Sequence, residues 1–172
     1  MLSVDFMHDA LSRKTLIKHV QNKNYYCRQG QKRLLAQAIA HYTKMLRADI
    51  LVQPIVVKDA PDTEDEERKR LEGKRILQKI EPKDMLIALH ETGQSMDSRG
   101  FARFLRPVLE APGQQCSFVL GGALGLSPEV LKAASMHLSL SPLTMPHELA
   151  LVVLYEQLFR AMTIMNQRTY HY

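Results

Sequence analysis

Residues 139–162 read SLSPLTMPHELALVVLYEQLFRAM: the end of a short apolar strand, a stiff loop and a strongly apolar helix. Pro142 and Pro146 stiffen the loop, because each proline fixes its own φ and disfavours a helical conformation at the preceding residue. The pattern predicts a helix that starts near Pro146 or His147 and needs two packing partners, because apolar residues cover two of its faces. The core stripe is Leu151, Leu154, Tyr155, Leu158, Met162 and Met165, and the second face is Leu149, Val152, Val153 and Phe159.

Strands and helices alternate along the rest of the chain. Residues 50–57 are rich in β-branched residues and predict a strand, and Pro54 favours a place at the sheet edge. Residues 14–20 fit either a strand or a frayed helix. Alternation at this spacing implies parallel pairing, so we expect one α/β domain, residues 1–172, with helices on both faces of a mainly parallel sheet. The other predicted strands are 85–89, 116–120 and 137–140, and the other helices are 31–46, 64–80, one capped by Asp97 or Ser98, and 128–135 capped by Ser127.

The composition is that of a globular protein with an excess of basic residues. Lys and Arg exceed Asp and Glu by 23 − 18 = 5 among 172 residues, which allows a polyanionic partner without proving one. The longest wholly apolar run, residues 149–155, is much shorter than a membrane span. The N-terminus has no apolar core of signal-peptide length. We therefore expect a cytoplasmic protein with no membrane partner.

The cysteines and histidines do not predict a metal site. Cys27 and Cys116 lie far apart and form no CxxC pair, so reduced thiols are the simplest interpretation. His90 and His147 each precede a glutamate, but HETG and HELA lack the second histidine of a zinc-binding helix. The chain also lacks the GxSxG turn of many hydrolases.

Three loops are placed where an α/β sheet binds its ligand, beyond the carboxyl ends of strands. They follow Leu89, Leu120 and Leu140. The GGALG segment after Leu120 is neither a P-loop nor a GxGxxG dinucleotide motif. Two interpretations stay open for its paired glycines: a tight turn, or a close approach of bare backbone to a ligand.

Six segments of the chain carry a family resemblance. In chain order they are QAIAHY (37–42), EGKRILQKI (72–80), LIALHETGQSMDSRGFA (86–102), LGGALGLSPEVL (120–131), LSLSPLTMPHELALVVLYEQLFRAMTI (138–164) and the terminal TYHY (169–172). The set resembles the ribosomal RNA large subunit methyltransferase H family, which are small SPOUT-class enzymes with a trefoil α/β knot. The resemblance runs from about residue 37 to the C-terminus.

The resemblance implies a homodimer that uses S-adenosylmethionine to methylate N3 of a pseudouridine in 23S rRNA, free or in the ribosome, without a metal. It places the cofactor in the three strand-end loops named above. Leu89 packs beside the adenosine, Gly122 lies where backbone must come close, and residues 140–145 enclose the adenine. The cofactor-binding residues implied in this way are Leu89, Gly121, Gly122, Leu140, Ser141, Pro142, Leu143, Thr144 and Met145.

The resemblance also places Arg160, Tyr170 and His171 at positions implicated in substrate recognition or catalysis. Arg160 would stabilise negative charge on the uracil oxygens, and His171 would accept the proton of the target nitrogen. An ion pair with Glu156, one turn earlier, is an alternative role for Arg160, and both roles are compatible. For the tail, the alternatives are a frayed end, or tyrosines that stack on a base while Arg168 contacts a phosphate.

The region before residue 37 departs from the family, which begins with an apolar strand and a VGK-like loop. Here the segment is longer and polar, and it contains NKNYYCRQG; residues 1–24 are a candidate N-terminal extension. Residues 16–20 or 25–27 supply the first strand, or the edge of the sheet is remodelled. The departure keeps two other functions open: an RNA- or nucleotide-binding module without transferase activity, and a SPOUT methyltransferase for another RNA.

Overall fold

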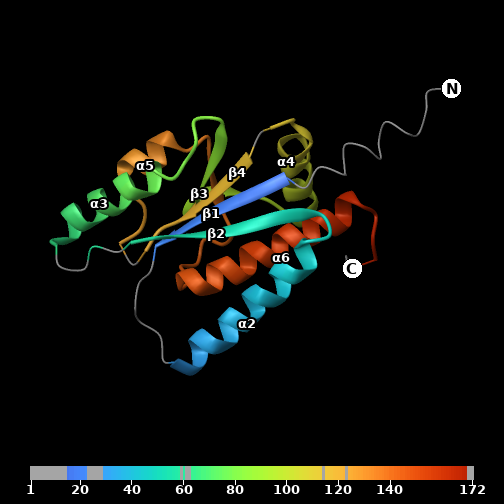
Figure 1. Ribbon diagram of the computed structural model, residues 1–172, viewed down its shortest axis with the longest axis horizontal. Helices are drawn as coiled ribbons and strands as arrows, with labels where there is room; N and C mark the ends of the chain where they lie inside the picture. Colours follow the sequence, from blue (N-terminus) through green and yellow to red (C-terminus); the bar gives the residue numbers. More distant parts are fainter. Residues whose placement is uncertain are drawn as a thin grey trace.

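The computed structural model describes residues 15–22, 29–58, 60, 63–113, 115–122 and 124–169, with side chains from Arg33 onwards. Five parallel strands form one sheet in the order β2-β1-β4-β3-β5 (Figure 1). This arrangement confirms the predicted α/β class with a parallel sheet, while the knot stays a prediction. The strands are β1 Thr15–Asn22, β2 Ile50–Val57, β3 Asp84–Ser95, β4 Gln115–Leu120 and β5 Met136–Ser139, and the helices are α2 Gln29–Leu46, α3 Asp65–Leu77, α4 Ser98–Glu110, α5 Pro128–Ala133 and α6 His147–Met165.

The first strand lies inside the sheet. β1 pairs with β2 on one side, where Thr15 faces Ile50, and with β4 on the other, where Ile17 faces Cys116. Of the alternatives for the N-terminal segment, residues 16–20 therefore supply the strand, and the idea of a remodelled edge is wrong; residues 25–27 lie outside the described part. β2 is the edge strand, which confirms the position inferred from Pro54, a residue that has no N–H for a further neighbour.

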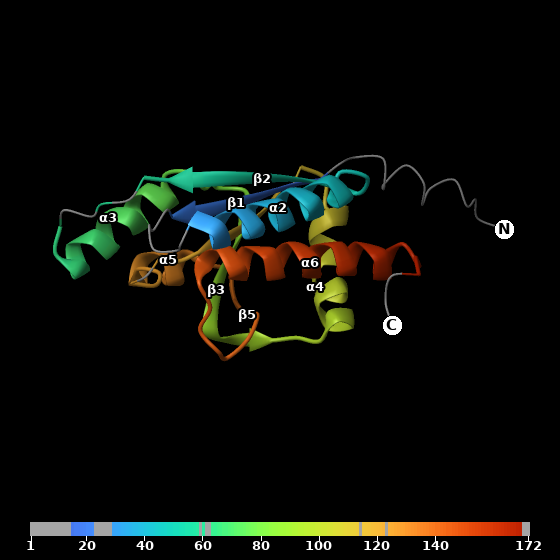
Figure 2. The ribbon, with the colours of Figure 1, turned by 90° about the horizontal axis from the view of Figure 1, so that it is seen from below.

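Helices cover both faces of the sheet and enclose two apolar cores. The larger core lies between the sheet and the layer of α2, α4 and α6, and the smaller one lies under α3 and α5 (Figure 2). β4 faces both, because Phe118 belongs to the larger core and Val119 to the smaller. This is the two-sided burial expected of a central parallel strand. No helix in the described part of the chain is long and apolar enough to cross a membrane.

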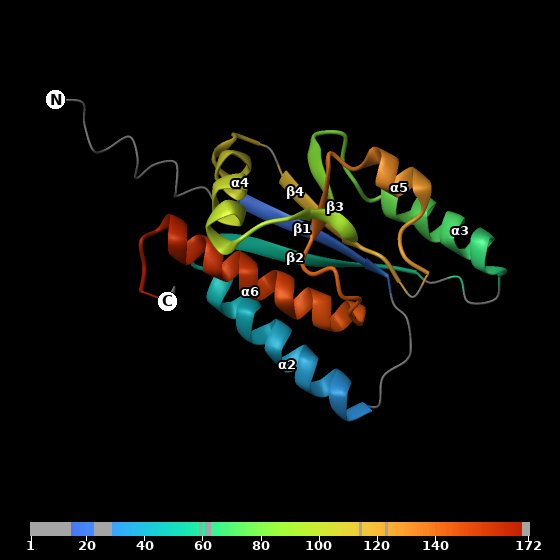
Figure 3. The same cartoon turned by 180° about the vertical axis from the view of Figure 1, so that it is seen from behind.

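Helix α6 has the two partners that its sequence requires. It packs along α2 and against α4, and the views from front and back both show α2 beside it (Figures 1 and 3). Leu154, Tyr155 and Leu158 of the predicted core stripe are fully buried. On the second face, Phe159 is buried and its ring lies 6.4 Å from that of Tyr42 in α2. The core stripe is therefore covered within one chain, while the second face is covered only in part: Val152 and Val153 are partly buried and Leu149 is 38% exposed.

Two helix starts follow the predicted capping chemistry. The Asp97 carboxylate accepts a hydrogen bond from the backbone N–H of Gly100, 2.5 Å away, at the start of α4. The Ser127 hydroxyl accepts one from the N–H of Val130 at the start of α5, where Pro128 is the first helical residue. A hydrogen bond from the Ser127 hydroxyl also lowers the pKa of Glu129.

β3 is longer than its sequence predicts. The apolar pattern ends at Leu89, but the strand continues to Ser95 with an irregularity in its pairing to β5. Both Leu89 and Gln94 pair with Leu138, so the four residues between them leave the regular ladder. Gly93 allows this excursion, because a Cβ there would stand 2.7 Å from the carbonyl carbon of His137. Polar residues 90–93 therefore reach the end of the sheet as part of β3.

Candidate functional site

Segments of β3, β4 and β5 come close to the start of α6 (Figure 2). Together they line a pocket of about 530 Å³. This is the carboxyl edge of the parallel sheet, where ligands of such folds bind. The three segments chosen from the sequence all contribute to it, although the one after Leu89 is part of β3 and the prediction of a loop there was wrong. Of the nine residues expected to bind a cofactor, all but Pro142 line the pocket: Leu89, Gly121, Gly122, Leu140, Ser141, Leu143, Thr144 and Met145.

The glycine turn after β4 forms one wall of the pocket. Gly125 donates its N–H to the Gly122 carbonyl at 3.0 Å, and the same two residues form a short antiparallel bridge. A Cβ on Gly121 would lie 2.6 Å from the carbonyl carbon of Gly125, and Gly125 itself has φ +76°. Gly121 and Gly125 are therefore required by the turn itself, while both glycines of the Gly121–Gly122 pair also line the pocket.

The loop after β5 forms the opposite wall. The Ser141 hydroxyl accepts a hydrogen bond from the Leu143 N–H at 3.0 Å, which closes a local turn. Leu143 is 76% exposed at the pocket rim, an unusual position for a leucine. Pro146 then gives the extended conformation, φ −54° and ψ 140°, from which α6 begins. The two prolines thus bracket an apolar rim that ends at a helix N-terminus.

Two histidine–glutamate pairs come together in the lining, one from β3 and one from α6. His147 Nε2 lies 3.2 Å from Glu148 Oε1, and both side chains are largely buried. His90 Nδ1 lies 2.9 Å from the Thr92 hydroxyl and accepts the Thr92 N–H at 3.3 Å, while Glu91 is half exposed. Among the described residues, no group of three or more His, Cys, Asp or Glu side chains is arranged to hold a metal ion.

Comparisons with known proteins decide the family. A family model described as "Predicted SPOUT methyltransferase" matches residues 23–171. A protein named ribosomal RNA large subunit methyltransferase H from Solidesulfovibrio magneticus is 40% identical over 136 residues, 79% of this chain and 88% of its own length. The protein of the same name from Maridesulfovibrio salexigens is 43% identical, over 78% of this chain and 87% of its own. The chain belongs to the ribosomal RNA large subunit methyltransferase H family of SPOUT methyltransferases.

A solved structure supports the fold of this SPOUT methyltransferase. A protein from Bordetella pertussis, described as a probable methyltransferase, superposes with a TM-score of 0.51 over 92% of this chain and 99% of its own. The two sequences are 18% identical, so the likeness concerns the fold. The family resemblance that the six sequence segments indicated is confirmed by the relatives above.

Arg160 does not reach the pocket of its own chain. It lies 160 − 147 = 13 positions after His147 in α6, which is about 20 Å along a helix with a rise of 1.5 Å per residue. Its guanidinium donates to the Glu156 carboxylate, with Nε 2.9 Å from Oε1, so the alternative ion pair is present. Tyr170 and His171 lie outside the described residues.

The approach to the tail is fixed by one carboxylate. After α6 the chain turns at Gln167, which has φ 54°. Arg168 then donates from both terminal nitrogens to Asp49, at 2.9 and 2.6 Å, and Asn166 donates to the same carboxylate at 2.9 Å. Arg168 is engaged within the chain, beside the α2–β2 turn, rather than extended from it.

Sequence reasoning missed several residues of the pocket, each next to one that it found. His90 and Glu91 follow Leu89, and His147 and Glu148 follow the proline loop. The signal in the sequence is the pair of His–Glu dipeptides, which lack the second histidine of a zinc-binding helix but follow two of the predicted ligand-binding segments. The remaining unpredicted lining residues are Leu120, Leu124, Gly125, Leu126, Pro146 and Ala150.

Two buried ionisable groups outside the pocket lining are inert. Burial, with a smaller effect of the Asp84 carboxylate, raises the pKa of the Cys116 thiol. Burial also raises the pKa of the Tyr155 phenol in the middle of α6. Both groups stay protonated at neutral pH, so neither provides a nucleophile or base.

Proposed function

We propose that the protein transfers the methyl group of S-adenosylmethionine to N3 of a pseudouridine in 23S rRNA. The observation that carries this proposal is the pocket lined by β3, β4 and β5, which gathers eight of the nine expected cofactor residues. The chain is also 40% identical to a relative named ribosomal RNA large subunit methyltransferase H. The relatives' names supply the class of substrate. The pseudouridine and its N3 atom come from the family resemblance.

The pocket suits an adenosyl ligand. Its volume of about 530 Å³ is in the range of sites for small molecules and cofactors. Leucines at positions 89, 140 and 143 supply apolar surface, and the turn at Gly121 and Gly122 supplies backbone without side chains. S-adenosylmethionine, when bound, supplies an electrophilic methyl group on a positively charged sulfur. The chain's own task at this end is to hold the ligand and exclude water.

The proposed catalytic groups act at the other end of α6. Arg160 would donate hydrogen bonds to uracil oxygens as negative charge develops on them. His171 would take the proton from N3, whose electron pair then accepts the methyl group; its unperturbed pKa of about 6.5 suits that role at neutral pH. Tyr170 would stack on the target base or an adjacent one.

Arg160 and the pocket of its own chain are too far apart to form one site. The first turn of α6, from His147 to Ala150, lies about 15–20 Å from Arg160 along the helix, so Arg160 would not contact a methyl group held in that pocket. We therefore propose a homodimer in which the pocket of one subunit meets Arg160 and the tail of its partner. The symmetry of a two-fold dimer would create two such sites.

The test is methylation of large-subunit RNA with isotopically labelled S-adenosylmethionine, followed by mapping of the labelled nucleotide. Free 23S rRNA, large subunits and assembled ribosomes are compared as substrates. We expect label on a single pseudouridine, at N3. Binding of donor and RNA without label would support a binding module instead, and label on another RNA would change the substrate class.

A second experiment tests the proton acceptor. We expect His171→Ala to reduce the single-turnover rate most strongly at neutral pH, and an increase in pH to restore part of it, because the target nitrogen then ionises without help. Full single-turnover activity in His171→Ala would remove this residue as the base. Affinity for S-adenosylmethionine serves as the control for folding of the pocket.

A further inference from the structure

The pocket is acidic although the chain is basic. The titratable residues of its described lining are the two His–Glu pairs, and neither lysine nor arginine is among them. The chain as a whole carries a net charge of +5 with neutral histidines. Two carboxylates in a concave site with apolar walls concentrate negative potential. The pocket therefore favours a ligand that carries positive charge.

Glu148 is the more buried of the two carboxylates. Its side chain is 21% exposed, and it is the acidic residue in the first turn of the 19-residue helix α6. No side chain caps the N-terminus of α6. Because His147 and Glu148 of the first turn line the pocket, the positive end of the helix dipole faces it. Stabilisation of α6 alone would explain an acid at this position. Because Glu148 also lines the pocket, it offsets a positive potential that would otherwise repel a cation there.

Glu91 is held at the pocket by its backbone. The Glu91 carbonyl accepts a hydrogen bond from the buried Ser139 hydroxyl of β5 at 3.1 Å. The excursion of β3 between Leu89 and Gln94 places this residue beyond the regular ladder. Its carboxylate is half exposed and lies 3.9 Å from His90 Nδ1. Glu91 therefore supplies a second negative charge, from β3 instead of α6, and its carboxylate is more exposed to solvent than that of Glu148.

We propose that Glu148 and Glu91 make the pocket select its ligand by charge, so that it binds the sulfonium donor more tightly than the neutral thioether product. Methyl transfer breaks the bond between carbon and sulfur, and the electron pair of that bond stays on sulfur, which loses its positive charge. The attraction to both carboxylates falls at that moment, which favours release of the product. This inference rests on the proposed function and adds residues that set the specificity of the same site.

The test compares three probes by calorimetry with the purified full-length protein at low salt. S-adenosylmethionine carries the sulfonium, sinefungin carries a protonated amine in its place, and S-adenosylhomocysteine is neutral at that position. We expect the two cationic probes to bind about tenfold more tightly than the neutral one, which corresponds to about 1.4 kcal/mol. Sinefungin separates the effect of charge from that of the extra methyl group.

Neutral variants identify the residues responsible. Glu148→Gln and Glu91→Gln should each reduce the preference for the cationic probes to about threefold, and the double variant should remove it, because each carboxylate attracts the charge independently. Salt should weaken the contribution of Glu91 more than that of Glu148, because screening acts on exposed charges. Affinity for S-adenosylhomocysteine should stay the same in every variant.

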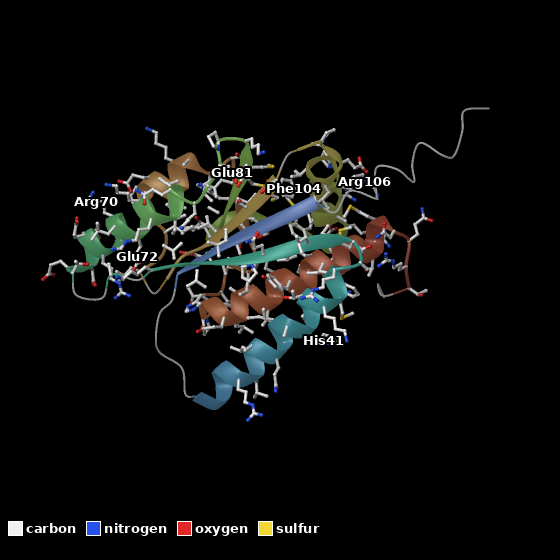
Figure 4. The ribbon with its side chains drawn as sticks, in the orientation of Figure 1. His41, Arg70, Glu72, Glu81, Phe104 and Arg106 are labelled. Atoms are coloured by element: carbon white, nitrogen blue, oxygen red, sulfur yellow. The ribbon has the colours of Figure 1, made fainter. Side chains whose placement is uncertain are left out.

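A matched control is Glu110→Gln on α4, which removes an exposed carboxylate paired with Arg106 (Figure 4) far from the pocket lining. It should leave the preference unchanged. Equal affinity of the wild-type protein for all three probes would overturn this inference and leave the proposed function intact. The inference is also overturned, with the proposed function intact, if Glu148→Gln and Glu91→Gln both keep the wild-type preference for the cationic probes. If none of the three probes binds, the proposed function and the inference are both overturned.

Discussion

The two ends of helix α6 differ in what surrounds them. The first turn, at His147 and Glu148, faces a pocket made by three strand ends and two loops. The second half carries Arg160 and leads to Arg168, whose partner Asp49 lies in the turn between α2 and β2. One end is built to hold a ligand within a single chain. The other presents cationic groups that its own pocket cannot use.

This difference explains how one small domain can divide its chemistry. The middle of α6 is fixed between α2 and α4 by fully buried side chains such as Leu154 and Leu158, so the helix cannot bring its two ends together. A rigid helix therefore keeps the donor end and the proposed catalytic end apart. In the proposed homodimer, the Arg160 end of a second copy would complete each pocket.

The largest effect is expected at the Arg160 end. Arg160→Ala should lower kcat by about 10²–10³-fold, the usual loss when a donor to a developing oxyanion is removed. Affinity for S-adenosylmethionine should stay within about twofold, because the nearest pocket-lining residue of α6, Ala150, is about 15 Å away along the helix. Single-turnover methylation and calorimetry give the two quantities.

Glu156→Gln is the matched control, since it breaks the same ion pair and keeps the guanidinium. It should cost less than about tenfold in kcat, as expected for a partly exposed i,i+4 pair. Equal losses in both variants would mean that Arg160 acts only through its partner.

A mixed dimer tests whether the two ends belong to different subunits. Thr144→Trp blocks the pocket from an exposed position on its rim, and Arg160→Ala removes the other end. Each variant alone should be nearly inactive. Coexpression should restore about one quarter of the wild-type activity, because half of the dimers are mixed and each contains one intact composite site. Activity that stays at background would favour a site within one chain.

A smaller effect is expected from the glycine turn. Gly121→Ala forces a Cβ against the Gly125 backbone, so the turn must shift at a cost of about 1–3 kcal/mol in unfolding free energy. The affinity for S-adenosylmethionine should fall about tenfold, or 1.4 kcal/mol. Gly113→Ala is the control: its φ of +72° also strains alanine, but nothing lies within 4 Å of the added Cβ. It should destabilise the fold and leave the affinity unchanged.

The smallest effect is expected where the tail begins. Asp49→Asn removes the charge that holds Arg168. The Asp49 side chain is only 5% exposed and accepts hydrogen bonds from Arg168 and Asn166, so the change should cost about 1–3 kcal/mol in unfolding free energy. The methylation rate should fall only a few-fold, about 2–5-fold, if the tail is still captured by the RNA. Thermal unfolding measures the change in stability, and steady-state kinetics measures the change in methylation rate. A loss as large as that of Arg160→Ala would show that the Asp49 contact itself orders the catalytic tail.

The sequence alone predicted most of the elements and eight of the eighteen residues that line the pocket. Periodicity, proline positions and capping residues act over a few neighbours, so α4, α5, α6 and the strand end at Leu120 could be predicted from local rules, and the end of β5 was predicted one residue too late, at Leu140 instead of Ser139. The strand–helix pattern also predicted where a ligand binds, while the family resemblance supplied the cofactor and the residues expected to bind it.

The tertiary structure decided three things that local patterns do not contain. It placed β1 inside the sheet, between β2 and β4, because its position depends on pairing with strands far away in the sequence. It extended β3 past Leu89 by an excursion that only the backbone of β5 makes compatible with pairing. It also brought His90–Glu91 and His147–Glu148 into one pocket, because parallel strands carry segments far apart in the chain to the same edge of a sheet.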